Sequence, residues 1–384
     1  RALAHVEKIE WIRPIEGADN IELIGVLGWI CVAKKGEFNV GDMAVYIEID
    51  SKCPETDERF AFLANKKFKV KTMKLGKFKV ISQGLALPLS LFPELQDRNI
   101  GDDVTEALKI TYASEEDAAR KTNKIDPNAK YKSMAKRRPK LFANPIVRRI
   151  MRYSIGRKIM FMLFGRKKDN PKKFPDWIVK TDETRIENAP FYLQSTEKWI
   201  KTEKCDGTSC TFAVDRLRKG KNKFDFIVCS RNVRQADREQ ACYHESNIYW
   251  ELADKYDIEK ILTQFATENN YNRVVLQGEG VGSVQGNPYK FTENKLFVFN
   301  LIIDGTRLGT VEMADFCKAH GLTSVPIIDT AYELPKTMEE MKLEADGYSE
   351  LNPKVKREGF VYRSIDGQQS FKNVSREYLL KHNG

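Results

Sequence analysis

A strongly basic segment near the middle of the chain is the feature that most constrains how it can fold. Residues 130–173 contain sixteen lysines and arginines and a single acid, Asp169. The whole chain of 384 residues carries a net charge of +10, so everything outside this segment is slightly acidic, at about −5. A chain of this length is too long for one ordinary core, and we expect two domains joined by a basic helical connector at residues 111–175.

Two helices are expected in this connector. Acids at residues 115–117 complement a helix N-terminus, and Pro145 suits the first turn of a second helix that runs to Met162. Apolar residues recur in the second helix at roughly helical spacing, with arginines between them: Ile146, Val147, Ile150, Met151 and Ile159. We expect the apolar stripe to pack on a neighbouring domain and the cations to contact an RNA backbone. Membrane binding is the least favoured interpretation, because the stripe is discontinuous.

Residues 1–110 have the pattern of an all-β domain. Short apolar stretches at residues 21–32, 43–50, 67–71 and 78–81 are separated by turn signals such as Gly41-Asp42. About five short strands in such a length suit a small antiparallel barrel. With a nucleic-acid partner expected, the OB-fold is the natural candidate for this barrel.

Residues 176–384 are predicted to form a mixed α+β domain. Strands are expected at residues 211–214, 224–229, 274–277, 296–303 and 359–363. Helices are expected at residues 243–256, 258–268, 311–320 and 338–343. The residues that carry chemical information fall on or beside the expected strands.

Lys204 begins the run Lys-Cys-Asp-Gly and has the setting of a lysine nucleophile. A lysine with the ordinary pKa near 10.4 is neutral in only about one molecule in a thousand near pH 7.4, a deficit of roughly 4 kcal/mol. A nearby cation, either a metal or another lysine, reduces that deficit. Asp206 would orient a sugar or coordinate a metal, and Gly207 would allow close approach of a phosphate-bearing group. Such a run arises by chance in roughly one chain in twenty, so further motifs must support it.

Further segments follow Lys204 in a fixed order. They are Ser230-Arg231-Asn232, residues 276–280 with Glu279, residues 295–300 with Phe297 and Phe299, residues 357–363 with Glu358 and Arg363, and Ser370-Phe371-Lys372. This series resembles the motifs of the covalent nucleotidyltransferase superfamily. More narrowly, residues 180–185, 202–209 and 370–380 resemble ATP-dependent RNA ligases that carry an N-terminal OB module. Residues 14–19, 41–42 with 47–51, and 81–88 match that module.

The resemblance implies an α+β nucleotidyltransferase, ATP-grasp-like with two antiparallel sheets and helices, preceded by an all-β OB-fold barrel. It implies an enzyme that uses ATP and Mg²⁺ or Mn²⁺ to seal RNA 3′-hydroxyl and 5′-phosphate ends, as in repair of a nicked duplex. Lys204 would attack the α-phosphorus of ATP to make lysyl-AMP. The AMP would pass to the 5′-phosphate end, and the 3′-hydroxyl would then displace it.

The resemblance also implies roles for individual residues. Nucleotide contacts are implied for Glu203, Asp206, Gly207, Arg231, Asn232, Glu279, Phe297, Phe299 and Lys372. Asp206 and Glu358 would serve the metal, the latter through water. In the N-terminal module, Glu48 or Asp50 would reach metal-bound water on the pyrophosphate.

Two positions in these motifs leave alternatives. Either Phe297 or Phe299 would stack on adenine, and since they lie two residues apart on one strand, both are expected to face the same way. The fifth motif often has two lysines separated by one residue, and here the first place holds Ser370. Phosphate charge would then be neutralised by Lys372, with further contacts expected from Ser370, Arg185, Arg363 or the OB module.

Two other functions stay open from the sequence: a GTP-using capping-type guanylyltransferase, and a non-catalytic RNA-binding protein that uses the barrel and the basic segment. Seven cysteines without a Cys-x-x-Cys pair indicate a reducing compartment, so we expect an intracellular, cytoplasmic protein. With no apolar run of eighteen residues, no membrane partner is expected. We expect a monomer, and a targeting segment lost before Arg1 stays open.

Overall fold

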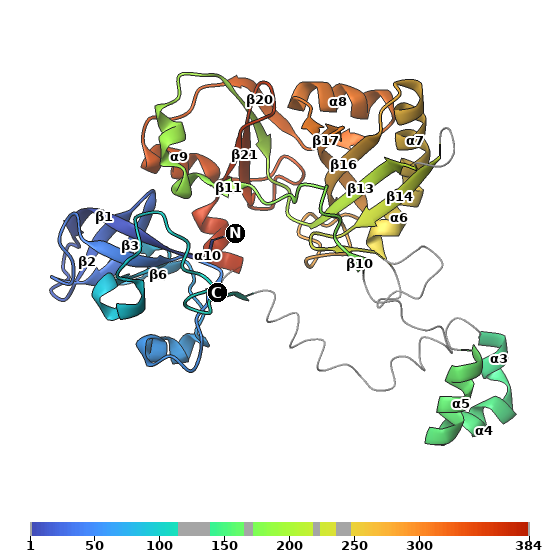
Figure 1. The fold of residues 1–384 in the computed structure, drawn as a ribbon, viewed down its shortest axis with the longest axis horizontal. Helices are drawn as coiled ribbons and strands as arrows, with labels where there is room; N and C mark the ends of the chain where they lie inside the picture. The colour runs from blue at the N-terminus through green and yellow to red at the C-terminus, as the bar shows by residue number, and fades with distance from the viewer. Residues whose placement is uncertain (1, 114–138, 165–171, 218–222, 236–246, 383–384) are drawn as a thin grey trace.

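The structure is a computed structural model that describes residues 2–113, 139–164, 172–217, 223–235 and 247–382. Figure 1 shows three parts: an N-terminal β domain, a group of short helices, and a larger α+β domain. No helix within the described ranges is both long and apolar enough to cross a membrane. The expected helix start at residues 115–117 lies outside the described residues.

The N-terminal domain is built on a five-stranded antiparallel sheet in the order β3-β2-β1-β4-β8. The strands are β1 (Ala4–Pro14), β2 (Ile21–Val26), β3 (Trp29–Lys34), β4 (Met43–Ile47) and β8 (Leu85–Pro88). The long β1 pairs with β4 through its first half and with β2 through its second half, around an irregularity between Ile9 and Trp11. This division lets one strand curve the sheet into a half-barrel with cores on both sides.

Shorter elements complete this domain. They are β5 (Ser51–Lys52), β6 (Met73–Leu75), β7 (Val80–Ser82), β9 (Thr111–Tyr112) and the 3₁₀ segments η1 (Glu58–Lys66), η2 (Leu89–Leu91) and η3 (Pro93–Leu95). The strand expected at residues 67–71 does not form as a regular strand, because Lys67 and Phe68 both have positive φ angles, of 53° and 59°. Pairing of β9 with β5 carries the domain to Tyr112.

Three short helices follow: α3 (Pro139–Ala143), α4 (Pro145–Arg152) and α5 (Ser154–Phe164). The single helix expected from Pro145 is broken at Tyr153, whose ψ of 140° is extended. The helices pack on one another around Phe142 and Met160, and in Figure 1 they lie apart from both larger domains. Ile146, Ile150 and Ile159 of the expected stripe are exposed. The prediction that the apolar stripe packs on a neighbouring domain is therefore wrong for the described residues.

The α+β domain contains two sheets (Figure 1). The larger has the path β10-β15-β14-β13-β16-β17-β18, with β19 paired to β17, and the smaller has the order β11-β22-β21-β12-β20. The larger sheet comprises β10 (Lys172–Lys173), β13 (Thr208–Arg216), β14 (Phe224–Cys229), β15 (Val233–Arg234), β16 (Arg273–Val281), β17 (Lys295–Ile303), β18 (Thr306–Arg307) and β19 (Thr323–Ser324). The smaller comprises β11 (Thr184–Arg185), β12 (Trp199–Glu203), β20 (Ile327–Tyr332), β21 (Gly359–Ser364) and β22 (Ser370–Val374).

Both sheets are antiparallel apart from the parallel pairs β11–β22 and β17–β19. Helices α6 (Ile248–Lys255), α7 (Ile258–Glu268) and α8 (Thr310–Ala319) share a core with the larger sheet. Helix α9 (Met338–Ala345) packs with the smaller sheet, and η5 (Pro190–Gln194) contributes to the same core. The predicted fold class, an α+β domain with two largely antiparallel sheets after an all-β domain, is confirmed.

The N-terminal domain is joined to the α+β domain through a specific interface. The Gly28 N–H donates to the Glu187 carbonyl at 2.8 Å, and a Cβ on Gly28 would lie 2.8 Å from the Glu187 Cα atom. Glu187 belongs to η4 (Ile186–Asn188). Val374 and Leu379, the latter in α10 (Arg376–His382), join the core of the N-terminal domain. The two domains therefore share buried apolar surface as well as hydrogen bonds.

Candidate active site

A cavity of about 370 Å³ lies between the two sheets and the N-terminal domain. Most of the residues singled out in the sequence line it: Arg185, Glu203, Lys204, Asp206, Gly207, Arg231, Glu279, Phe299, Glu358, Arg363 and Lys372. Asp50 and Tyr112 of the N-terminal domain, and Tyr378 and His382 of α10, complete the wall. Segments far apart in the sequence thus meet around one cavity.

Lys204 follows directly after β12, and its side chain is held at the cavity wall. Its backbone N–H donates to the Gly359 carbonyl at 2.9 Å, which fixes it against β21. Its Nζ atom lies 2.8 Å from Glu358 Oε1. Gly207 packs so closely on β16 that a Cβ there would collide with the Gly280 carbonyl oxygen. The glycine in the Lys-Cys-Asp-Gly run therefore lets the segment between Lys204 and β13 pack closely on the neighbouring strand β16.

Carboxylates dominate the electrostatics around Lys204. Burial alone would lower the pKa of Lys204, but Glu358, Glu279 and Asp206 outweigh it and raise this pKa above its ordinary value. Burial, reinforced by Glu358 and Asp206, raises the pKa of Glu279 to about 8. The pKa of Asp206 is also raised, mainly by burial and then by Glu358. This side of the cavity has more negative charge than one lysine neutralises.

The opposite charge gathers on another wall of the cavity. Lys372 Nζ donates to Asp182 Oδ1 at 2.7 Å, and Arg231 Nη2 lies 3.3 Å from Asp182 Oδ2. Burial, followed by the charge of Arg185, lowers the pKa of Lys372 to about 8. A buried lysine with this pKa gains from an anion nearby, since an anion stabilises its charged form.

Arg185 links the cavity to the N-terminal domain. Its Nη2 atom donates to Asp50 Oδ2 at 3.0 Å. Its Nε and Nη1 atoms are buried and have no hydrogen-bond partner among the described residues. Buried guanidinium donors are rarely left unsatisfied, and their planar fork suits phosphate oxygens. The arrangement fits a phosphate group held between Arg185 and Lys372.

The two phenylalanines of β17 differ in position. Phe297 is 7% exposed and packs in a core cluster with Tyr289 and Val325, whereas Phe299 is half-buried and lines the cavity. The pairing of β16 with β17 skips Phe299, because Gly278 pairs with Val298 while the preceding residue, Gln277, pairs with Asn300. Phe299 nevertheless packs against the same apolar cluster as Phe297, so both rings lie on one face of the strand, as expected. Of the two, only Phe299 lines the cavity.

Comparisons with known proteins agree with this architecture. A family model described as an OB-fold domain matches residues 3–89, and an RNA ligase model matches residues 197–381. A structure of Naegleria gruberi RNA ligase with PPi is 31% identical, with alignment over 100% of this chain and 99% of that chain and a TM-score of 0.76. The chain belongs to the RNA ligase family. The predicted enzyme class and the OB-fold are thereby confirmed, against a capping enzyme or a non-catalytic binding protein.

Two further structures of the Naegleria gruberi RNA ligase show the same likeness. A mutant with AMP and Mn is 31% identical over 100% of this chain and 99% of that chain, with a TM-score of 0.75. A mutant with ATP and Mn is 30% identical over 100% of this chain and 98% of that chain, with a TM-score of 0.74. A comparison of the sequence with curated proteins gives no significant match.

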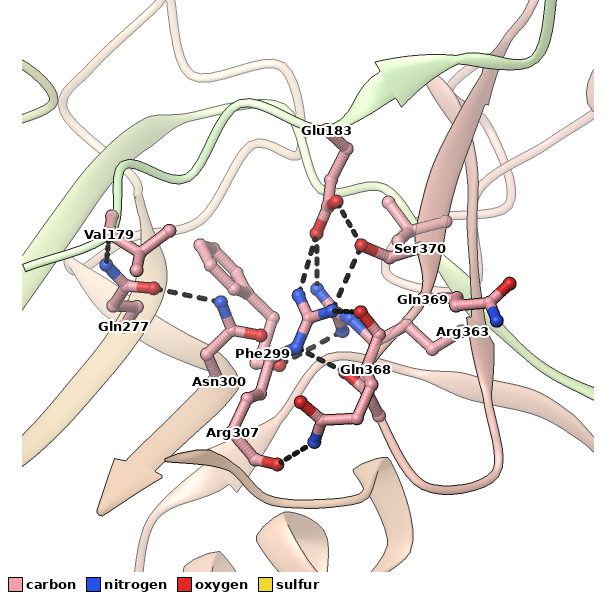
Figure 2. A network of polar contacts seen from close by, with 12 residues as sticks. Val179, Glu183, Gln277, Phe299, Asn300, Arg307, Arg363, Gln368, Gln369 and Ser370 are labelled. Atoms are coloured by element: carbon pink, nitrogen blue, oxygen red, sulfur yellow. Dashed lines mark hydrogen bonds and ion pairs between the residues drawn. The ribbon is translucent and has the colours of Figure 1, made fainter. Parts of the chain in front are cut away.

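In this RNA ligase, Ser370 does not line the cavity around Lys204. Figure 2 shows it in a polar network beside the cavity, where its hydroxyl donates to Glu183 and accepts from Arg307 Nη2 at 3.2 Å. Glu183 also pairs with Arg363 at 3.1 Å, and Arg363 Nη1 donates to the Phe299 carbonyl at 3.0 Å. Burial alone would raise the pKa of Glu183, but Arg363, Ser370 and Arg307 lower it. Ser370 thus supports the cavity wall, and the geometry does not favour a direct phosphate contact.

Two other predicted site residues have neighbours that differ from expectation. Asn232 lines an adjacent cavity of about 1080 Å³ instead of the cavity around Lys204. The Glu203 carboxylate accepts hydrogen bonds from the Ser349 hydroxyl and from the Glu350 N–H at 2.7 Å. Glu203 therefore anchors a loop that follows α9. A nucleotide would have to compete with Ser349 and Glu350 for the Glu203 carboxylate.

The sequence did not single out three residues that the RNA ligase places at the cavity. Asp182 lies between Lys372 and Arg231, Tyr378 hydrogen-bonds to Asp206, and His382 stacks on Tyr378 with ring centroids 4.1 Å apart. Asp182 falls within residues 180–185, which carried part of the resemblance, so a signal for it was present. Tyr378 likewise falls within residues 370–380, which carried part of the resemblance, whereas His382 lies beyond them.

Proposed function

We propose that this RNA ligase seals 3′-hydroxyl and 5′-phosphate ends at a nick in duplex RNA, with ATP as the source of AMP. The observation that carries the proposal is Lys204 Nζ, which lies 2.8 Å from Glu358 Oε1 in a cavity that Glu279, Lys372 and Arg185 also line. A nucleophile, carboxylates and phosphate-binding cations are thereby within one site. These are the groups that adenylyl transfer through a lysine requires.

In the first step, Lys204 Nζ attacks the α-phosphorus of ATP. A nitrogen–phosphorus bond forms, the bond to the pyrophosphate oxygen breaks, and pyrophosphate leaves. The ammonium must lose its proton before the attack, and Glu358 is the carboxylate that already accepts a hydrogen bond from it. Lys372 and Arg185 would stabilise the negative charge that develops on the phosphate oxygens.

The next two steps use the same cavity. An oxygen of the RNA 5′-phosphate attacks the phosphorus of lysyl-AMP, which releases Lys204 and leaves AMP on the RNA end. The 3′-hydroxyl of the adjoining strand then attacks the 5′-phosphate, and AMP leaves as the phosphodiester forms. Phe299, which faces the cavity, is the proposed adenine contact, and Arg231 and Glu279 are the proposed contacts to the nucleotide sugar.

The donor set fits a divalent cation such as Mg²⁺ or Mn²⁺. Asp206, Glu279 and Glu358 crowd negative charge around Lys204, and burial followed by the charges of Glu358 and Asp206 raises the pKa of Glu279. No three histidine, cysteine or acidic side chains within the described ranges lie close enough to bind one metal together. Asp206 and Glu358 would therefore hold a hydrated ion through water. Such an ion would lower the pKa of Lys204 and neutralise phosphate charge.

Sealing of a defined nick tests the proposal. A duplex RNA with a labelled 5′-phosphate opposite a 3′-hydroxyl should yield a joined strand with ATP and Mg²⁺ or Mn²⁺. GTP should not replace ATP, and a nick with 3′-phosphate and 5′-hydroxyl ends should stay open. Joining of the latter ends, or equal activity with GTP, would contradict the proposed reaction.

A further inference from the structure

A second lysine-rich surface lies on the N-terminal domain, separate in sequence from the basic segment of residues 130–173. No aspartate or glutamate occurs at residues 59–93. Seven lysines fall in this interval, and we call them the OB lysine surface: Lys66, Lys67, Lys69, Lys71, Lys74, Lys77 and Lys79. The overall acidic balance outside the basic segment hides this local excess of positive charge.

The fold exposes these lysines along one continuous stretch of chain. Five of them, at positions 66, 67, 74, 77 and 79, are exposed, and Lys69 and Lys71 are half-buried. The intervening Val70 is only 4% exposed, whereas Lys69 and Lys71 on either side of it are partly open to solvent. Lys74 lies on β6, while Lys77 and Lys79 lie in the turn that joins β6 to β7.

The positive charge of this surface is largely uncompensated. Within the part of the chain that the structure describes, no ion pair involves Lys67, Lys71, Lys74, Lys77 or Lys79. Between residues 66 and 79 the aromatic rings, Phe68 and Phe78, are half-buried, and the Lys77 ammonium lies 5.1 Å from the Phe78 ring. The exposed ring of Phe62 lies outside this interval, on η1. Surfaces for single-stranded RNA present exposed aromatic rings on which bases stack. Flexible lysines without such rings suit the phosphates of a duplex backbone.

The part of the OB lysine surface around Val70 is hydrogen-bonded to a segment of the cavity wall. The Asp50 N–H donates to the Val70 carbonyl at 3.0 Å, and the Val70 N–H donates to the Ser51 carbonyl at 2.9 Å. Asp50 lines the cavity and pairs with Arg185, so the lysines on either side of Val70 flank a segment that reaches the cavity. An RNA backbone that crosses this surface is therefore led toward Lys204.

We propose that the OB lysine surface binds the phosphates of duplex RNA beside the nick and orients the nick toward the cavity. This inference rests on the proposed sealing of nicked duplexes. A different role would be protection of the exposed β6–β7 edge against pairing with another chain, for which lysines also serve. RNA affinity separates the two roles, because edge protection requires no RNA.

A charge-reversal pair of variants tests the inference. The test variant is Lys74→Glu/Lys77→Glu/Lys79→Glu, and the matched control is Lys8→Glu/Lys34→Glu/Lys35→Glu, which reverses three exposed lysines elsewhere on the same domain. Binding of both to nicked duplex RNA and to single-stranded RNA is measured over a range of salt concentrations. Formation of lysyl-AMP from ATP alone and the melting temperature are measured in parallel to report the fold.

The test variant should bind the nicked duplex roughly tenfold more weakly at moderate salt, with a log–log salt slope shallower by about 3, at about 0.9 per lost phosphate contact. The control should stay within about twofold of the wild type, and both should form lysyl-AMP normally. Equal duplex affinity of the two variants, or an equal loss for single strands, would overturn the inference.

If the wild-type ligase does not seal nicked duplexes, the proposed function fails first and the inference with it. If the test variant has a lower melting temperature than the wild type, the variant Lys74→Gln/Lys77→Gln/Lys79→Gln replaces it. This variant should show a smaller loss of duplex affinity, and wild-type affinity would again overturn the inference.

Discussion

At the scale of single residues, charge balance around Lys204 governs the site. Glu279 has a pKa of about 8, raised by burial and then by Glu358 and Asp206. A group whose pKa rises on folding stabilises the fold at low pH and loses that contribution as pH increases toward the folded value. The metal-free ligase should therefore lose stability from about pH 4.5, the ordinary glutamate value, up to about pH 8.

Glu279→Gln should remove this loss. Without metal or nucleotide, the melting temperature of the variant should equal that of the wild type near pH 4.5 and exceed it at pH 8 and above, because glutamine never ionises. Thermal melts across this pH range measure the difference. A constant difference across the range would show that Glu279 does not titrate in it.

The two phenylalanines of β17 offer a second residue-scale test. Phe297→Ala should cost roughly 3–5 kcal/mol of stability, because it removes a buried ring from the core. Phe299→Ala should destabilise far less and should raise the KM for ATP about tenfold or more, because the proposed aromatic contact to adenine would be lost. Denaturant unfolding and ATP kinetics separate the two effects. The converse result, with ATP binding lost only in Phe297→Ala, would reverse the assignment.

At the scale of secondary-structure elements, periodicity predicted regular segments well. The helix expected at residues 258–268 is α7, and the strand expected at residues 224–229 is β14. Departures from regularity were not predictable, because they depend on tertiary packing. The bulge at Phe299 has no local sequence cue, and the break at Tyr153 interrupts a pattern that is otherwise helical.

Helix α10 is another element whose role depends on tertiary packing. Its Leu379 packs in the core of the N-terminal domain, while the preceding Tyr378 hydrogen-bonds to Asp206 in the cavity. The helix therefore couples the docking of the OB domain to a proposed metal-binding carboxylate. The sequence resemblance at residues 370–380 includes β22 and the first part of α10. Only the structure shows that α10 lines the same cavity as Lys204.

Tyr378→Phe should raise the concentration of Mg²⁺ or Mn²⁺ needed for half-maximal lysyl-AMP formation, by about threefold to tenfold. The hydroxyl that orients Asp206 would be lost, while the ring would still pack on the N-terminal domain. Tyr348→Phe, at an exposed tyrosine, is the matched control and should leave the metal requirement unchanged. If the metal requirement of Tyr378→Phe matches that of the control, the hydrogen bond does not position Asp206.

At the scale of the whole molecule, the site belongs to both domains. The order of motifs identified the α+β domain and its N-terminal OB module, since each motif is local in sequence. Two contacts join the domains: Arg185 with Asp50, and Gly28 with Glu187. Each joins residues more than a hundred positions apart, so no local sequence pattern predicts it. The sequence thus predicted which domains are present, while the shared cavity required the fold.

Gly28→Val tests whether docking of the OB domain is required. A side chain there would meet the Glu187 backbone, so the domains should separate while each keeps its own core. Lysyl-AMP formation should fall at least tenfold, because Asp50 and Arg185 would no longer meet at the phosphate site. Gly76→Val, at an open position with an ordinary φ, should have little effect. Full activity of Gly28→Val with a broken interface would show that the OB domain is dispensable for this step.

The most direct test of the account is covalent labelling with ATP that carries a label on its α-phosphate. The wild-type ligase with Mg²⁺ or Mn²⁺ should retain the label after denaturation, and Lys204→Ala should retain none. The control Lys198→Ala changes an exposed lysine just before β12 and should be labelled normally. Peptide mapping should find the AMP on Lys204. Labelling that persists in Lys204→Ala, or maps to another lysine, would contradict the central claim.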